Sequence, residues 1–405
     1  MSKPPTGLIC TAMRFTCAAD FPNYPSFLTY QEESKTMIKR VALFLLLALS
    51  LILASCAPQP TAAPTEPAAP DQPAQPTQVE QAPVQPTQTE APAKTYKVAL
   101  ITAQGGLGDR SYNDSGYEGL KRAEKELGVE VKVIESADPV GEGEQLLRSA
   151  AESGFDLVIT LEYSHFDPLA RVAPDYPNTT FAILNIAVEG DNVVSVIFKE
   201  HEASFLAGAL AAMVTTMEGN ELVNPEAVIG AIGGTQSPGI DKFIVGYTEG
   251  AQYINPDVKV LSAYSNSFGD PAKGRELALA MYDQGADVVF QIAGGTGEGV
   301  FQAAEEAKHY AIGVDSDQDY IKPGFILTSM IKRVDNAVYD LCSRLVSGTL
   351  KGGSIVEYGL KEEGVGLSPM TYTKDKLPAE FMTKVEELKA KIISGEIKVT
   401  DITKQ

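Results

Sequence analysis

The 405-residue sequence has no tryptophan and few of the residues that bind metals or act as nucleophiles. Its three histidines are scattered along the chain: His165, His201 and His309. Its four cysteines are also scattered, without metal-ligand spacing: Cys10, Cys17, Cys56 and Cys342. Because Cys342 has no partner, we expect a buried core thiol there. The composition therefore predicts no metal site, and it argues against a zinc enzyme or a histidine-triad enzyme.

Positive charge is scarce as well. The chain has 33 Lys and Arg residues against 53 Asp and Glu residues, which gives a formal net charge of -20. Proteins that bind nucleic acids or polyphosphates usually present a basic surface. The charge balance therefore predicts no nucleic-acid partner.

Long hydrophobic runs are also few, and the one near the start of the chain covers residues 41–52. This run is short for a membrane-spanning helix, which needs about 20 apolar residues. A basic segment, Met37-Ile38-Lys39-Arg40, precedes it, and Leu53-Ala54-Ser55-Cys56 follows it. A basic start, an apolar run of secretory length and small residues before a cysteine resemble a bacterial lipoprotein signal. The resemblance implies cleavage before Cys56 and lipidation of its thiol.

The signal divides the N-terminal part of the chain into three segments. Residues 1–36 show no helical or strand pattern, and we interpret them as an extension from a misassigned start codon. Residues 37–55 are the predicted signal peptide. Residues 56–94 are rich in Pro, Ala, Gln and Thr and have too few apolar side chains to form a core. We predict a disordered tether that holds a globular domain at the outer face of the bacterial cytoplasmic membrane.

The globular part contains two successive series of alternating strand and helix patterns. We expect the first series in residues 95–217, with strands at 96–102, 129–134, 156–161, 180–184 and 193–198. We expect the second in residues 218–322, with strands at 228–232, 259–264, 287–292 and 310–314. The alternation predicts α/β structure, with two doubly wound parallel-sheet lobes and a ligand cleft between them. Residues 323–405 are expected to form a crossover and a C-terminal segment that returns largely to lobe 1.

A glycine loop, Gly294-Gly295-Thr296-Gly297-Glu298-Gly299, follows one of these strands, and Asp315 follows the next. Val300-Phe301 replaces the Lys-Ser or Lys-Thr of a phosphate-binding loop, and the glycine spacing is one residue short of the dinucleotide fingerprint. Ligands bind beyond the carboxyl ends of parallel strands, so we expect this loop and Asp315 to form one wall of a small-molecule site. A plain strand-to-helix turn remains an alternative for the loop alone.

Several short motifs occur in a fixed order within residues 96–369. They are Asp109-Arg110-Ser111-Tyr112-Asn113, Gly116-Tyr117-Glu118-Gly119, Phe198-Lys199-Glu200, Ser267-Phe268-Gly269-Asp270-Pro271, Gly313-Val314-Asp315-Ser316-Asp317 and Thr328-Ser329-Met330-Ile331-Lys332. Together they resemble the basic membrane protein (BMP) family of substrate-binding lipoproteins, which includes bacterial purine nucleoside receptors. The resemblance implies a type I periplasmic-binding fold, with two lobes joined by three crossovers. It also implies an ABC permease with its ATPase subunit as partners, no cofactor and no enzymatic activity.

The resemblance also suggests residues for a nucleoside site. Tyr117 and Phe268 match the aromatic residues that would sandwich the base. Asp315 matches the carboxylate that would accept hydrogen bonds from the ribose diol. Lys332 matches a lysine that would donate to the sugar oxygens and offset the buried charge. The backbone of Gly294 and Gly295 would approach the sugar.

Four more polar residues are candidates, with less defined roles. Asp109 and Asn113 would read polar edges of the base or, alternatively, cap the helix that starts near Asp114. Asn185 stands where the nucleoside receptors commonly carry Asp, and Glu162 stands where the family tends to have a glycine-rich segment. These two departures leave open a nucleoside with different polar edges or another small molecule.

The sequence is compatible with three functions. We favour the first, a receptor that delivers a nucleoside-like ligand, preferably a purine nucleoside, to an ABC permease. The second is an enzyme acting on nucleotides or sugars, which would use the loop at 105–108 and Glu135. That loop lacks the dinucleotide spacing, and no base–nucleophile pair stands out. The third is a membrane-tethered ligand sensor of the same fold without a transporter.

Overall fold

The computed structural model describes residues 94–404. The predicted N-terminal extension, the signal peptide, Cys56 and all of the tether except Lys94 lie outside the described residues. Within residues 94–404, no helix combines the length and the apolarity needed to cross a bilayer.

The first lobe is built on a six-stranded sheet in the order β11-β5-β4-β3-β1-β2, and all its neighbouring strands are parallel. The strands are β1 (Lys97–Ile101), β2 (Glu130–Ile134), β3 (Leu157–Thr160), β4 (Thr180–Leu184), β5 (Val193–Phe198) and β11 (Ser354–Tyr358). Its central strands are apolar on both faces, as expected for a parallel sheet covered by helices on each side.

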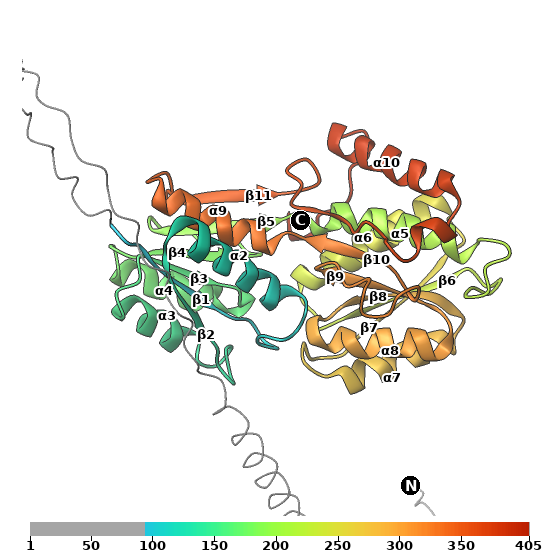
Figure 1. The fold of residues 1–405 in the computed structure, drawn as a ribbon, viewed down its shortest axis with the longest axis horizontal. Helices are drawn as coiled ribbons and strands as arrows, with labels where there is room; N and C mark the ends of the chain where they lie inside the picture. The colour runs from blue at the N-terminus through green and yellow to red at the C-terminus, as the bar shows by residue number, and fades with distance from the viewer. Residues whose placement is uncertain (1–93, 405) are drawn as a thin grey trace, which may run out of the picture. The chain divides into compact units, whose positions relative to one another are not determined.

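The helices of this lobe cover the two faces of the sheet in pairs (Figure 1). They are α2 (Tyr112–Leu127), α3 (Gly143–Glu152), α4 (Phe166–Val172) and α9 (Val334–Val346). Successive strand residues point to opposite faces. Leu100 accordingly packs in one core cluster with Leu120 of α2, whereas Ile101 packs in another with Leu147 of α3.

The second lobe repeats this plan with a six-stranded sheet in the order β12-β10-β9-β8-β6-β7. Its strands are β6 (Val228–Gly233), β7 (Lys259–Tyr264), β8 (Ala286–Ile292), β9 (Tyr310–Asp315), β10 (Ile326–Lys332) and β12 (Val365–Leu367). Only the short strand β12 is antiparallel to its neighbour, β10. Its helices are α5 (Glu200–Thr215), α6 (Pro238–Ile254), α7 (Pro271–Tyr282), α8 (Gly297–Ala307) and α10 (Ala379–Ser394).

Helices α5 and α6 approach each other closely because glycines line their contact. A Cβ atom at Gly208 would lie 1.9 Å from the carbonyl oxygen of Tyr247, and one at Gly250 would lie 1.9 Å from that of Phe205. Glycine is therefore required where the two backbones meet.

The two-lobe α/β fold is confirmed, but the lobe boundaries differ from the prediction. The chain passes between the lobes three times: between β5 and α5, between β10 and α9, and between β11 and β12. Helix α5 was expected in lobe 1, but it packs on α6 in lobe 2 because its apolar surface is buried there. Residues 323–405 return to lobe 1 only through α9 and β11, whereas β10, β12 and α10 belong to lobe 2.

Candidate ligand-binding cleft between the lobes

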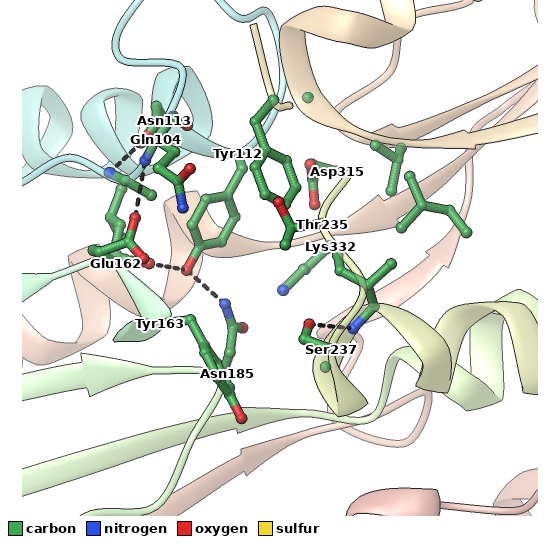
Figure 2. Close-up of a pocket in the computed structure, with 18 of the residues that line it drawn as sticks. Gln104, Tyr112, Asn113, Glu162, Tyr163, Asn185, Thr235, Ser237, Asp315 and Lys332 are labelled. Atoms are coloured by element: carbon green, nitrogen blue, oxygen red, sulfur yellow. Dashed lines mark hydrogen bonds between the residues drawn. The ribbon is translucent and has the colours of Figure 1, made fainter. Parts of the chain in front are cut away.

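A cavity of about 280 Å³ lies between the lobes, at the carboxyl ends of the parallel strands (Figure 2). Lobe 1 contributes the loop after β1, the first turn of α2 and the residues that follow β3 and β4. Lobe 2 contributes the start of α6 and the ends of β8, β9 and β10. This is the position in which open parallel sheets bind their ligands.

Three charged side chains form a buried ion-pair triad at one wall of the cavity. The Glu200 carboxylate lies 2.8 Å from the ammonium of Lys332 and 2.6 Å from that of Lys242. All three side chains are at most 4% exposed. Burial alone would raise the pKa of Glu200, but the two lysines outweigh it and lower this pKa to about 2. Glu200 is therefore ionised at neutral pH.

The ammonium of Lys332 is also surrounded by aromatic rings. It lies 4.9 Å from the ring centroid of Tyr112, 5.0 Å from that of Phe198 and 5.6 Å from that of Phe243. Such contacts favour a cation because the face of an aromatic ring is negative. Glu200 and the three rings together fix the position of Lys332 in the cavity wall.

Asp315, the last residue of β9, faces Lys332 in the same cavity but is held from the opposite lobe. The Ser111 hydroxyl donates a hydrogen bond of 2.5 Å to Asp315 Oδ2. Within the described residues, no ion pair joins Lys332 to Asp315, since Lys332 is paired with Glu200 instead. Burial raises the pKa of Asp315 to about 6, although Lys332 and Ser111 act in the opposite direction. A carboxylate with a second oxygen available suits a ligand hydroxyl group.

The side chains of Tyr112 and Asn185 form a chain of hydrogen bonds at the lobe 1 wall (Figure 2). The Tyr112 hydroxyl donates to the carbonyl oxygen of Leu161 at 3.1 Å and accepts from Asn185 Nδ2 at 2.8 Å. Burial raises the pKa of Tyr112 well above its usual value, so the hydroxyl keeps its proton. Asn185 has a positive φ of 75°, which asparagine tolerates better than most residues.

Asp109 and Asn113 line the cavity, but protein groups already occupy much of their polar capacity. Asp109 accepts hydrogen bonds from the backbone N–H groups of Ser111, Asn113 and Asp114. Asn113 accepts from the Ala103 N–H at 2.7 Å and donates to Asp109 at 3.0 Å. These bonds favour the alternative in which both residues order the start of α2.

Glu162 follows the same pattern at the end of β3. One carboxylate oxygen accepts from the N–H of Gln104 at 3.0 Å, and the other accepts from the N–H and hydroxyl groups of Ser164 at 3.1 and 2.8 Å. Its main contacts therefore tie the loop after β1 to the short 3₁₀ turn Tyr163–His165.

Only some of the predicted aromatic and glycine site residues lie at the cavity. Phe268 and Gly294 line the cavity. Gly295 is not among the lining residues but lies beside Asp109, since a Cβ atom on it would be 3.8 Å from Asp109 Cβ. The structure differs from the prediction at Tyr117, which also does not line the cavity. Its ring instead lies 4.7 Å from the Lys121 ammonium on the same helix.

Several polar residues that line the cavity were not predicted from the sequence, among them Tyr112, Glu200, Thr235, Ser237 and Lys242. One of them, Ser237, had a usable signal, because Ser237-Pro238 combines a preferred N-cap residue with proline at the first helical position. This signal predicts where α6 begins, and the structure places that start at the cavity. Tyr112 is offset by five residues from Tyr117 in the same helix, and only the observed orientation of α2 distinguishes them.

Comparisons with known proteins assign a family to this fold and cleft. Residues 96–403 match the family model Bmp, described as ABC transporter substrate-binding protein PnrA-like. The ABC transporter nucleoside-binding protein BmpA of Lactococcus lactis is 36% identical over 334 residues, covering 77% of this chain and 91% of that protein. An uncharacterized lipoprotein of Pyrococcus abyssi is 36% identical over 315 residues, covering 75% and 76% of the two chains.

The solved structures agree with the observed architecture. The crystal structure of an ABC transporter system solute-binding protein from Aeropyrum pernix superposes with a TM-score of 0.68 at 34% identity. The match covers 75% of this chain and 92% of that one. The expected type I periplasmic-binding fold is therefore confirmed.

Proposed function

The chain belongs to the Bmp family of PnrA-like ABC transporter substrate-binding proteins, and on this premise we propose that its cleft binds a nucleoside, with purine nucleosides preferred. Its role is that of a binding protein and not of an enzyme. The cavity composition carries the ligand assignment, because it combines aromatic faces with a buried hydrogen-bond acceptor.

The aromatic part of the site suits a flat base. Tyr112 from lobe 1 and Phe268 from lobe 2 both line the cavity. Aromatic stacking contributes about 0.5–1.5 kcal/mol beyond the burial of area. Asp315 supplies an acceptor for sugar hydroxyl groups, and burial at 7% exposure keeps competing water from it. The nucleoside-binding name of the Lactococcus lactis relative supports this assignment.

The charges of the cavity favour a ligand without phosphate. Four carboxylates and two ammonium groups line it: Asp109, Glu162, Glu200, Asp315, Lys242 and Lys332. Both ammonium groups are already paired with Glu200. A phosphate would therefore meet an excess of negative charge and no available cation in this wall. We accordingly assign nucleosides, and not nucleotides, to the site.

The proposed location and partners follow from the family and the N-terminal segment. Lipidation of Cys56 would anchor the chain at the outer face of the bacterial cytoplasmic membrane, and the lipoprotein name of the Pyrococcus abyssi relative supports an anchor. The lobes would close on the nucleoside and deliver it to an ABC permease with its ATPase subunit.

A thermal-shift screen of the purified full-length chain tests the ligand assignment. The ligands are purine and pyrimidine nucleosides, free bases, nucleotides and sugars. A ligand at 100 times its Kd adds about 2.7 kcal/mol to the free energy of unfolding. We expect stabilisation by purine nucleosides and its loss in Asp315→Ala. Stabilisation by another class of molecule alone would leave the fold assignment standing and reject the nucleoside.

A further inference from the structure

The position of Glu200 connects the cavity to the chain segments that join the lobes. It is the first residue of α5 and follows the crossover from β5, while Lys332 is the last residue of β10, before the crossover to α9. Lys242 lies in the first two turns of α6 and also donates to the carbonyl oxygen of Phe198, at 3.0 Å. A single carboxylate thus serves two ammonium groups that come from different elements.

The triad leaves the lysines with little capacity for an anionic ligand. Each ammonium lies within 2.8 Å of a Glu200 oxygen, and the carboxylate is buried with them. Two buried cations without this carboxylate would repel each other and would attract any anion that entered the cavity. The remaining carboxylate near Lys332 does not replace Glu200, because Asp315 is hydrogen-bonded to Ser111 across the cleft.

We propose that Glu200 determines the charge of the ligand that this cavity accepts, because it occupies both buried ammonium groups that a phosphate would otherwise bind. Glu200 acts mainly through Lys332 and is in this sense a positioning residue. Its carboxylate holds Lys332 as a donor for uncharged oxygens and prevents it from acting as a phosphate-binding cation. This inference rests on the proposed nucleoside-binding function and specifies how phosphorylated nucleosides are rejected.

The test compares Glu200→Gln with the wild type by isothermal titration calorimetry on the full-length chain. The probes are inosine, inosine 5′-monophosphate and inosine 3′-monophosphate, so that the position of the phosphate does not decide the outcome. The measured quantity is the affinity of each monophosphate divided by that of inosine. We expect this ratio to rise at least tenfold for one monophosphate in Glu200→Gln, because an amide is uncharged and leaves the ammonium groups unpaired.

Two matched variants distinguish a role of Glu200 in selecting the charge of the ligand from a role in stabilising the fold. Glu200→Asp keeps the charge and is expected to keep the wild-type ratio, even where a shorter side chain weakens all binding. Glu202→Gln changes a carboxylate of the same helix that accepts from the Leu360 N–H and does not line the cavity, so the ratio stays at the wild-type value. A structural defect would lower all affinities together and would not change the ratio.

A double variant tests the proposal if Glu200→Gln alone does not fold. Glu200→Gln combined with Lys242→Met removes one buried cation together with the carboxylate, so no pair of like charges remains. Lys332 still loses its anionic partner, and we expect the monophosphate ratio to rise at least fivefold. If the folded variants still bind inosine and their ratio of monophosphate affinity to inosine affinity is unchanged, the proposed role of Glu200 is refuted. That result would not affect the nucleoside assignment. Absence of inosine binding in the wild type would instead reject the nucleoside assignment.

Discussion

The Ser111 hydroxyl of lobe 1 donates a hydrogen bond of 2.5 Å to the Asp315 carboxylate of lobe 2. Two further contacts lie beside this bond. Gln318 Nε2 donates to the carbonyl oxygen of Arg110 at 3.0 Å, and the Arg110 guanidinium lies 3.4 Å from the Glu298 carboxylate. Asp315, the proposed ligand-binding carboxylate, is therefore part of the contact that holds the lobes together. Ligand binding and closure of the lobes both involve this side chain.

The first prediction concerns this bond. Ser111→Ala removes a donor to a buried carboxylate, and hydrogen bonds to charged groups contribute about 1.5–3 kcal/mol. We expect the Kd for inosine to increase about tenfold or more, since 1.4 kcal/mol corresponds to a factor of ten. Calorimetry measures the change. Ser115→Ala is the control, because the Ser115 hydroxyl accepts from the Asp335 N–H within lobe 1 and does not line the cavity.

The second prediction concerns pH. The pKa of Asp315 is raised to about 6 in the folded protein, from a usual value of 3.8. The folded state therefore holds this proton more tightly than the unfolded state, and Asp315 reduces stability progressively as the pH rises from about 4 to about 6. A ligand that donates hydroxyl groups to the ionised form lowers this pKa. We expect the affinity for inosine to rise from pH 5 to pH 7 and then to level off.

Asp315→Asn provides the comparison for the pH profile. Its amide has no charge to titrate, so inosine binding is expected to be weaker and almost independent of pH in this range. A profile that falls toward pH 7 in the wild type would show that the ligand prefers the protonated carboxyl group.

The third prediction distinguishes the two aromatic candidates suggested by the family resemblance. Phe268 lines the cavity, and Phe268→Ala removes both a stacking face and apolar area, so we expect at least a tenfold loss of affinity for inosine. Tyr117 does not line it, and Tyr117→Ala is expected to change the Kd less than threefold. Fluorescence or calorimetric titration of both variants with inosine measures the two Kd values. A large effect at Tyr117 would place the base differently from the cavity described above.

The fourth prediction concerns the contact between α5 and α6. In Gly208→Ala the new Cβ atom meets the Tyr247 carbonyl oxygen, so the helices must move apart, and we expect a loss of about 3 kcal/mol in the free energy of unfolding. Gly366→Ala is the matched control, because nothing lies within 4 Å of its added Cβ atom, and its expected change is below about 1 kcal/mol. Equal effects in chemical denaturation would contradict the packing argument.

The strands were the most predictable part of the structure. The predicted bounds of β4, β5 and β7 agree with the observed ones because polar or turn residues border short apolar and β-branched runs. Strand β11 was missed because it lies at the sheet edge and alternates between exposed and half-buried residues, which weakens its apolar pattern. Strand β12 was missed because three residues carry no periodicity.

The site was less predictable, because its charged residues depend on tertiary contacts. Asp315 and Phe268 were identified through motifs, and the structure places both at the cavity. Lys242 gave no such signal, since a lysine near a helix start usually faces solvent, whereas here it is paired with Glu200 of α5 and donates to the carbonyl oxygen of Phe198 in β5. The pairing of Lys332 with Glu200 was equally hidden, because their contact joins residues 132 positions apart.

The three passages of the chain between the lobes also determine when each lobe can be completed during synthesis. The edge strand β11 of lobe 1 ends at Tyr358, and helix α10 of lobe 2 ends at Ser394. Neither lobe is a contiguous stretch of polypeptide, so a ribosome releases nearly the whole chain before either sheet has all its strands. Truncation before β11 would thus damage both lobes at once, and neither lobe can be produced separately by simply cutting the gene in two.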